Sequence, residues 1–180
     1  MNDLTKLATG AIITLIIGGT AYSFNQADVV KNFAEDTGLT QQQAEQYISG
    51  ISEDELASFD ELGADEISLG QGLLSSASKI DCVNYEYEWE SGTLSCSEGK
   101  AQINKIARDS ISLGQAYIKL VSDSASKNDI SATIGLIDQQ NDSLESQILI
   151  SLIDRATIDE MKQTNSYNKA LLKAALESGE

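Results

Sequence analysis

Hydrophobic residues recur every three or four positions along most of the chain from about residue 27 onward, which is the spacing of an amphipathic α-helix. Successive hydrophobic stripes are separated by only a few residues, and short connections favour antiparallel neighbours. The pattern therefore predicts a mostly α-helical bundle. The expected helices cover residues 28–35, 41–49, about 53–62, 65–80, 100–124, 130–140, 144–161 and 166–177.

Small and polar residues mark where these helices are expected to begin and end. Thr40 and Gln43 have the spacing of a capping box, in which each side chain bonds the backbone amide of the other residue. Polar runs at 141–143 and 164–165 are expected to separate the last three helices. Glycines that can take a left-handed conformation are predicted to stop the earlier ones. These glycines are Gly38, Gly50 and Gly63.

The stretch Leu7–Phe24 differs from the rest, because it carries no charge over eighteen residues and directly follows Lys6. As a helix it would be about 27 Å long, close to the roughly 30 Å hydrocarbon core of a bilayer. It predicts an N-terminal transmembrane helix. The alternatives are a cleaved secretory signal peptide and a buried helix of a soluble protein.

The charges around this stretch favour the amino terminus in the cytoplasm and the remaining chain on the periplasmic or extracellular side. Small residues before position 24 would also permit cleavage, which would release a secreted protein. In a retained helix, Gly10, Thr14 and Gly18 would line one face, as in closely packed transmembrane helices. The chain then divides into an anchor or signal at 1–24 and one acidic helical domain at 25–180.

Composition narrows the functions open to this domain. The chain has 28 acidic and 12 basic residues, and this net charge of −16 disfavours nucleic acid, whose phosphates are bound by Lys and Arg. It equally disfavours anionic lipid surfaces and favours a basic partner or a cation. Histidine is absent, which excludes Ser-His-Asp, Cys-His and HExxH sites. We expect no cofactor, and no residue pattern predicts a metal site.

Seven acidic residues between Glu53 and Glu66 crowd two of the expected helix starts, where the helix dipole favours carboxylates. A docking face for a basic partner and a loose calcium site are the functional alternatives. The spacing differs from that of an EF-hand loop, because the apolar residues Leu56 and Phe59 occupy positions where oxygen ligands would fall.

Cys82 and Cys96 are the only cysteines, and in an oxidising compartment we expect them to form a disulfide. Their spacing does not match CxxC redox or zinc motifs. Between them, Tyr85, Tyr87 and Trp89 alternate with glutamates, which is the period of a β-strand. A Ser-Gly turn follows, so the segment predicts a small disulfide-closed β-hairpin. Its aromatic face is expected to pack on the helices or, if exposed, to bind a partner or a sugar.

One short motif occurs twice. The sequence ISLGQ occupies residues 67–71 and again residues 111–115, each time within an expected helix. We interpret Gly70 and Gly114 as positions that let two helices cross closely, in a duplicated hairpin or by chance similarity.

These observations favour a non-catalytic protein of the cell envelope, an interaction or structural subunit with a protein partner or a second copy of itself. A different class is suggested by Glu90-Ser91 followed by Ser112–Gln115, which resembles the ES and GLxQ signatures of lytic transglycosylases. The resemblance implies a cell-wall enzyme with Glu90 as the acid. The segment between the two motifs is longer than in that family.

A pilin-like filament subunit is a further alternative, because pilins also join a short leader and an apolar helix to a soluble head. The chain departs from the bacterial pilin pattern at Ala11, where an aromatic residue is usual, and at Leu15, where Glu is usual.

Overall fold

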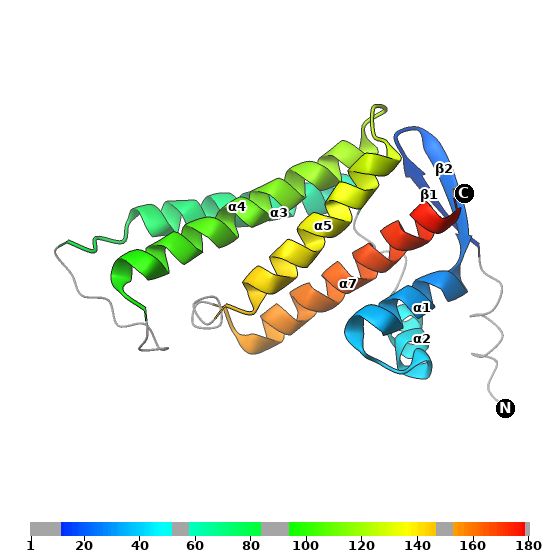
Figure 1. The fold of residues 1–180 in the computed structure, drawn as a ribbon, viewed down its shortest axis with the longest axis horizontal. Helices are drawn as coiled ribbons and strands as arrows, with labels where there is room; N and C mark the ends of the chain where they lie inside the picture. Colours follow the sequence, from blue (N-terminus) through cyan, green and yellow to red (C-terminus); the bar gives the residue numbers. More distant parts are fainter. Residues whose placement is uncertain (1–11, 52–57, 84–93, 147–152, 179–180) are drawn as a thin grey trace.

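The computed structural model describes residues 12–51, 58–83, 94–146 and 153–178, which form a mostly helical domain with one small sheet. Two strands precede two short helices, and four longer helices follow (Figure 1). The strands are β1 (Ile12–Ile17) and β2 (Thr20–Asn25). The helices are α1 (Gln26–Thr37), α2 (Gln41–Gly50), α3 (Phe59–Ser78), α4 (Cys96–Val121), α5 (Lys127–Leu144) and α7 (Arg155–Ser178).

The prediction of an N-terminal helix over Leu7–Phe24 is wrong for residues 12–24, which form an antiparallel β-hairpin. Ile17 pairs with Thr20 across a two-residue turn, and both turn residues have positive φ, 58° at Gly18 and 71° at Gly19. Two such residues suit the right-handed twist of hairpin strands, and β-branched residues favour the extended chain before them. Within the described ranges, no helix has both the length and the apolar character to cross a bilayer.

The hairpin packs one face on the helices and leaves the other exposed. Ile17, Tyr22 and Phe24 lie in the main core together with residues of α1, α2, α4, α5 and α7. On the opposite face, Ile12 is 74% and Ile16 is 65% exposed. The turn docks on the end of α4, where the Gly18 amide donates to the Leu120 carbonyl (3.1 Å), and lies against Ala125 in the connection to α5.

Some predicted helix ends are confirmed. Gly38 follows α1 with a φ of 70°, and the capping box of Thr40 and Gln43 starts α2. Gly50 lies inside the last turn of α2 and has no left-handed conformation. Gly63 does not stop a helix, because α3 runs through it to Ser78.

The polar runs at 141–143 and 164–165 also fail to break helices. α5 continues to Leu144, and α7 is continuous from Arg155 to Ser178. One polar side chain of each run is buried and bonded to another helix: Ser143 is 6% and Asn165 is 4% exposed.

The prediction that glycines bring two helices together is confirmed for α3 and α4. A Cβ atom on Gly70 would lie 2.5 Å from the carbonyl oxygen of Ala107, and one on Gly114 would lie 2.5 Å from that of Gly63. Both distances are too short for any residue but glycine. Gly63 pairs with Gly114, and seven residues further on Gly70 pairs with Ala107, so the two helices run antiparallel.

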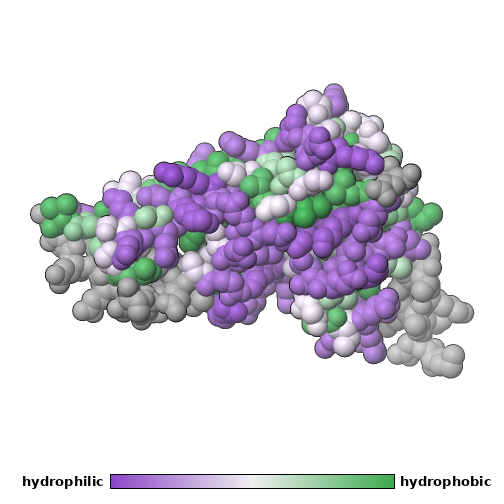
Figure 2. Space-filling view, in the orientation of Figure 1, coloured by the Kyte–Doolittle hydropathy of each residue, from purple (hydrophilic) through white to green (hydrophobic). Residues whose placement is uncertain are grey.

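The pair of α3 and α4 extends beyond the other helices as an arm (Figure 1). Near its far end, Ala77 and Ile103 form a small core of their own with Leu73, Ile80 and Leu94. In the orientation of Figure 1, hydrophilic residues cover most of the surface formed by α5 and α7 (Figure 2).

Lys169 of α7 joins three helices by ion pairs with Asp36 of α1 and Asp138 of α5. Its side chain is only 11% exposed. Burial lowers the pKa of the Lys169 ammonium, but the hydrogen bonds and charges of Asp138 and Asp36 outweigh it and raise the pKa above its ordinary value. The stabilisation is therefore fully present at neutral pH and is lost only as the pH rises through this raised pKa.

We predict that Gly70→Ala lowers the free energy of unfolding by about 2 kcal/mol, because the new methyl group would push against the backbone of α4. Gly72→Ala is the matched control on the same helix, since a Cβ atom there meets nothing within 4 Å. It should raise stability by about 0.5–1 kcal/mol through helix propensity. Urea denaturation measures the free energy of unfolding of each variant. Equal changes for Gly70→Ala and Gly72→Ala would contradict the close contact at Gly70.

Replacing Lys169 by Ala should lower the free energy of unfolding at pH 7 by about 2 kcal/mol, because it leaves Asp36 partly buried without its cation. The control Lys31→Ala removes an exposed lysine of α1. It should change the free energy of unfolding by less than about 0.5 kcal/mol. Thermal unfolding monitored by circular dichroism gives the comparison. A Lys169 variant as stable as the Lys31 variant would show that the ion pairs contribute nothing.

Candidate functional site

A layer of polar side chains crosses the bundle and meets at Gln140 of α5, which is 1% exposed. Its Nε2 donates to Oε2 of Glu66 on α3 (2.5 Å) and to Oγ of Ser110 on α4 (3.2 Å). Its Oε1 accepts from Nδ2 of Asn165 on α7 (2.6 Å). One amide therefore connects four helices, and each of its buried polar atoms has a partner, as burial requires.

A second carboxylate in this layer, that of Asp109 on α4, is fully satisfied. Its Oδ2 accepts from Nζ of Lys105 (2.7 Å) and from Oγ of Ser143 (2.8 Å). Its Oδ1 accepts from Nε2 of Gln139 (2.7 Å). The lysine offsets the negative charge, so this cluster has the arrangement of a structural ion pair.

Glu66 differs from Asp109 because it forms no ion pair with any described lysine or arginine. Burial raises the pKa of the Glu66 carboxyl, and hydrogen bonds from Gln140 and Ser110 only partly oppose this. Perturbed carboxyl groups of this kind are concentrated at functional sites. Glu66 is therefore a candidate for a binding or chemical role.

A cavity of about 210 Å³ lies beside Glu66, between α3, α4 and α7. Tyr117 lines it, and its hydroxyl oxygen accepts from Nδ2 of Asn168 at 3.5 Å. Burial raises the pKa of this hydroxyl, so it stays protonated at neutral pH. The described lining residues are Leu62, Glu66, Tyr117, Thr157, Glu160, Met161, Thr164, Asn165 and Asn168.

A larger groove of about 1050 Å³ adjoins this cavity. Residues of β1, α2, the start of α3 and α7 form its walls, and most of them are apolar. The groove and the cavity share Leu62, Glu160, Thr164 and Asn168. Neither is lined by a described lysine or arginine. Both spaces expose more apolar than polar surface, and Glu66 and Glu160 are the acidic residues that line the cavity.

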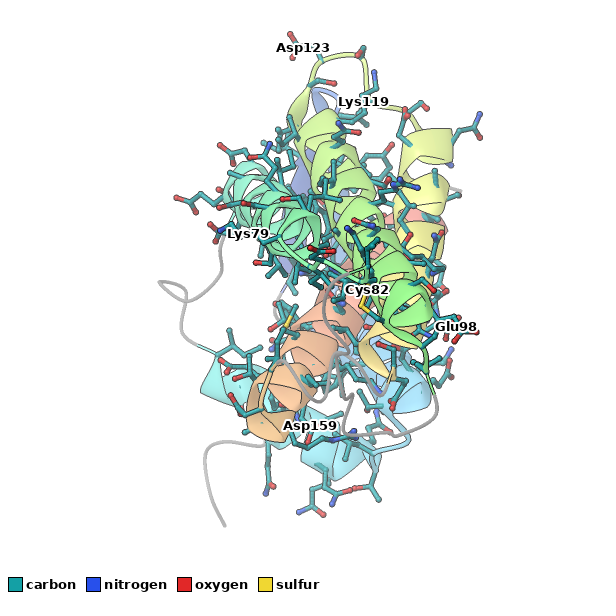
Figure 3. The ribbon with its side chains drawn as sticks, turned by 90° about the vertical axis from the view of Figure 1, so that its left-hand side faces the viewer. Lys79, Cys82, Glu98, Lys119, Asp123 and Asp159 are labelled. Carbon is teal, nitrogen blue, oxygen red and sulfur yellow. A yellow bond between two sulfur atoms is a disulfide. The ribbon has the colours of Figure 1, made fainter. Side chains whose placement is uncertain are left out.

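The predicted disulfide is confirmed at the end of the arm. Cys82 and Cys96 are bonded, with their Cα atoms 5.6 Å apart, and the bridge lies between the ends of α3 and α4 (Figure 3). Nζ of Lys100 donates to the Ile80 carbonyl beside it (2.9 Å). Val83, next to the bridge, is 92% exposed.

Several predicted site residues fall outside the described ranges. These are Gly10, Tyr85, Tyr87, Trp89 and Glu90, together with most of the predicted hairpin at the disulfide. Ser95, which belongs to the segment predicted to form the hairpin, is instead the N-cap of α4. The aromatic surface and the transglycosylase-like acid stay predictions.

The predicted membrane-packing helix face of Gly10, Thr14 and Gly18 is wrong for Thr14 and Gly18, the two residues of the three that the structure describes. Thr14 lies in β1 and Gly18 in the hairpin turn, so their spacing of four does not place them on one helix face. The pilin-like alternative loses its long apolar helix for the same reason. Across the described residues, no group of three or more acidic or cysteine side chains is placed to hold a metal ion.

Sequence reasoning missed the residues of the cavity, although one signal was present. Thr133, Ile137, Gln140 and Leu144 follow one another at spacings of four, three and four, the stripe of a buried helix face. A glutamine inside such a stripe must find partners on other helices. No comparable pattern around Glu66 points to its position at a cavity.

No family model matches this chain, and no similar protein was found among curated proteins or solved structures. Its class is therefore defined by its own features: an acidic, mostly helical, disulfide-bridged domain with a glycine-packed arm and an internal carboxylate cavity.

We predict that Glu66→Gln raises the melting temperature at pH 7, because it removes a buried charge and keeps an oxygen that can accept from Gln140. Since the folded-state pKa of Glu66 is raised, the wild-type penalty disappears as the pH falls through that pKa toward the ordinary value. The difference between the two proteins should shrink accordingly. A difference that is constant from pH 8 to pH 5 would contradict this assignment.

Proposed function

We propose that this protein is a non-catalytic interaction protein that acts in an oxidising compartment, on the periplasmic or extracellular side of the cell envelope. The supporting observation is the Cys82–Cys96 bridge at the end of the arm. Structural disulfides persist in oxidising compartments and are rare where thiols are kept reduced.

The position of the bridge suggests how the arm is used. The glycine contacts of α3 and α4 hold the two helices together, and the bridge fixes both ends of the loop between the cysteines at the tip. A loop with fixed ends loses less entropy on binding than a free segment does. We propose that this loop, with Tyr85, Tyr87 and Trp89, is the surface that a partner contacts.

The charge of the chain indicates the kind of partner. The loop alternates its aromatic residues with glutamates, and the whole chain carries a net charge of −16. Complementary charge speeds association and selects against acidic partners. We therefore propose a protein partner with a basic surface.

The first test concerns the compartment. Full-length protein from its native cells should be recovered from the envelope or extracellular fraction with both cysteines bonded, as measured by mass after alkylation without reductant. Recovery from the cytosol with both thiols alkylated would refute the proposal.

The second test concerns the loop. We predict that replacing Tyr85, Tyr87 and Trp89 together by Ala weakens binding of a protein partner that co-purifies with the full chain by at least about tenfold, because buried aromatic residues dominate interface energies. Quantitative pull-down of the full chain measures this loss. Val121→Ala, an exposed residue of α4 away from the tip, is the control and should leave binding unchanged. A partner retained equally by both variants would place the interface elsewhere.

A further inference from the structure

We propose that the cavity beside Glu66 and the groove that adjoins it bind one small amphiphilic cation, with its protonated amine in the cavity and its apolar chain in the groove. This site is separate from the tip of the arm and does not depend on the partner proposed there.

The charge of the site argues for a cationic head group. Glu66 contributes an inner carboxylate and Glu160 one that borders both spaces, while no described lining residue is basic. Elsewhere in the described chain, the buried carboxylate of Asp109 and the partly buried one of Asp36 each have a lysine partner. A buried carboxylate without a cation is costly unless it is protonated or a cation is supplied. A bound ammonium would supply it.

The hydrogen-bonding groups of the cavity suit an ammonium group. Such a group has three donors and no acceptor, so it needs several acceptors around it. Among the lining residues, Glu66 and Glu160 carry carboxylates, Asn165 and Asn168 carry amides, and Tyr117 carries a hydroxyl group. A volume of about 210 Å³ accommodates a head group of this size but not a whole lipid or a folded partner.

The groove suits the rest of the ligand. Ile13 and Leu15 of β1 line it together with residues of α2 and α7, and Leu62 of α3 lines both the groove and the cavity. Its volume of about 1050 Å³ is at the upper end of the range for small-molecule sites, roughly 300–1,000 Å³. Burial of each methylene group should tighten binding by about fourfold.

Isothermal titration calorimetry of the full-length protein at pH 7 tests this proposal, with decylamine as the probe. Decanol and decanoate have the same chain with a neutral and an anionic head, and all three are used below the concentrations at which they aggregate. Decylammonium should bind saturably at one site. Its affinity should exceed that of decanol by at least about tenfold, because its head forms charge-assisted hydrogen bonds with carboxylates.

Two variants assign the effect to Glu66. Glu66→Gln should reduce the affinity for decylammonium to that for decanol and leave the affinity for decanol within about twofold, because the groove is unchanged. Asp123→Asn removes the same charge from an exposed turn between α4 and α5 and should have no effect. Circular dichroism shows whether each variant keeps its helical content.

The proposal would be overturned if decylammonium binds no better than decanol, if Glu66→Gln and Asp123→Asn bind it equally, or if binding never saturates. Self-association of the protein that decylammonium does not reverse would assign the groove to a second copy of the chain, which also overturns it. Loss of loop-dependent partner binding with retention of the amine preference would refute only the function of the arm.

Discussion

The direct contact between the backbones of α3 and α4 is the constraint on which the described structure depends. Helices packed through ordinary side chains lie about 8–10 Å apart, whereas Gly63, Gly70 and Gly114 leave no room for even a Cβ atom. The repeated ISLGQ motif makes this contact reciprocal. A Cβ atom on Gly114 would meet Ile67, and one on Gly70 would meet Ile111, so each copy provides the glycine that receives the isoleucine of the other. So close an approach brings many atoms within range of dispersion attraction, which lets two helices pack together beyond the rest of the bundle.

The alignment of α3 against α4 also determines where the residues of the cavity lie. Glu66 immediately precedes Ile67, so seating Ile67 against Gly114 also fixes where the Glu66 carboxylate lies relative to α5 and α7. Gln140 then bonds Glu66 and Asn165 at once, which sets the positions of the outer helices. A shift of the α3–α4 contact by one helical turn would move Glu66 about 5 Å along the axis, out of reach of Gln140. The geometry of the candidate ligand site is thus determined by a glycine contact that the ligand never touches.

Sequence patterns predicted the parts of the fold that depend on local chemistry. Helical periodicity gave the helical class, Thr40 and Gln43 formed the expected capping box, and Gly38 ended a helix. The disulfide followed from two cysteines in a chain with no metal motif. The hairpin at β1 and β2 was missed, because hydrophobicity alone was read as a membrane helix. Its signal was present as two runs rich in β-branched and aromatic residues, separated by Gly-Gly, which is a hairpin pattern. Local strand chemistry and packing on the core outweighed the length of the apolar run.

The remaining errors share one physical cause, and it concerns the candidate site. Gly63, the run at 141–143 and the run at 164–165 were all read as helix ends, because glycine and short polar residues are unfavourable inside an exposed helix. Inside a bundle the same residues serve tertiary contacts: Gly63 touches α4, Ser143 donates to Asp109, and Asn165 donates to Gln140. Their local cost is offset only by partners on other helices, which a single sequence does not reveal. Residues that weaken a helix locally are therefore kept where they bring helices together, and the cavity beside Glu66 lies among them. Glu66 is the member of this layer whose charge has no described counter-ion, so the cost of its burial is offset only in part, by hydrogen bonds from Gln140 and Ser110. That imbalance is what a bound cation would remove.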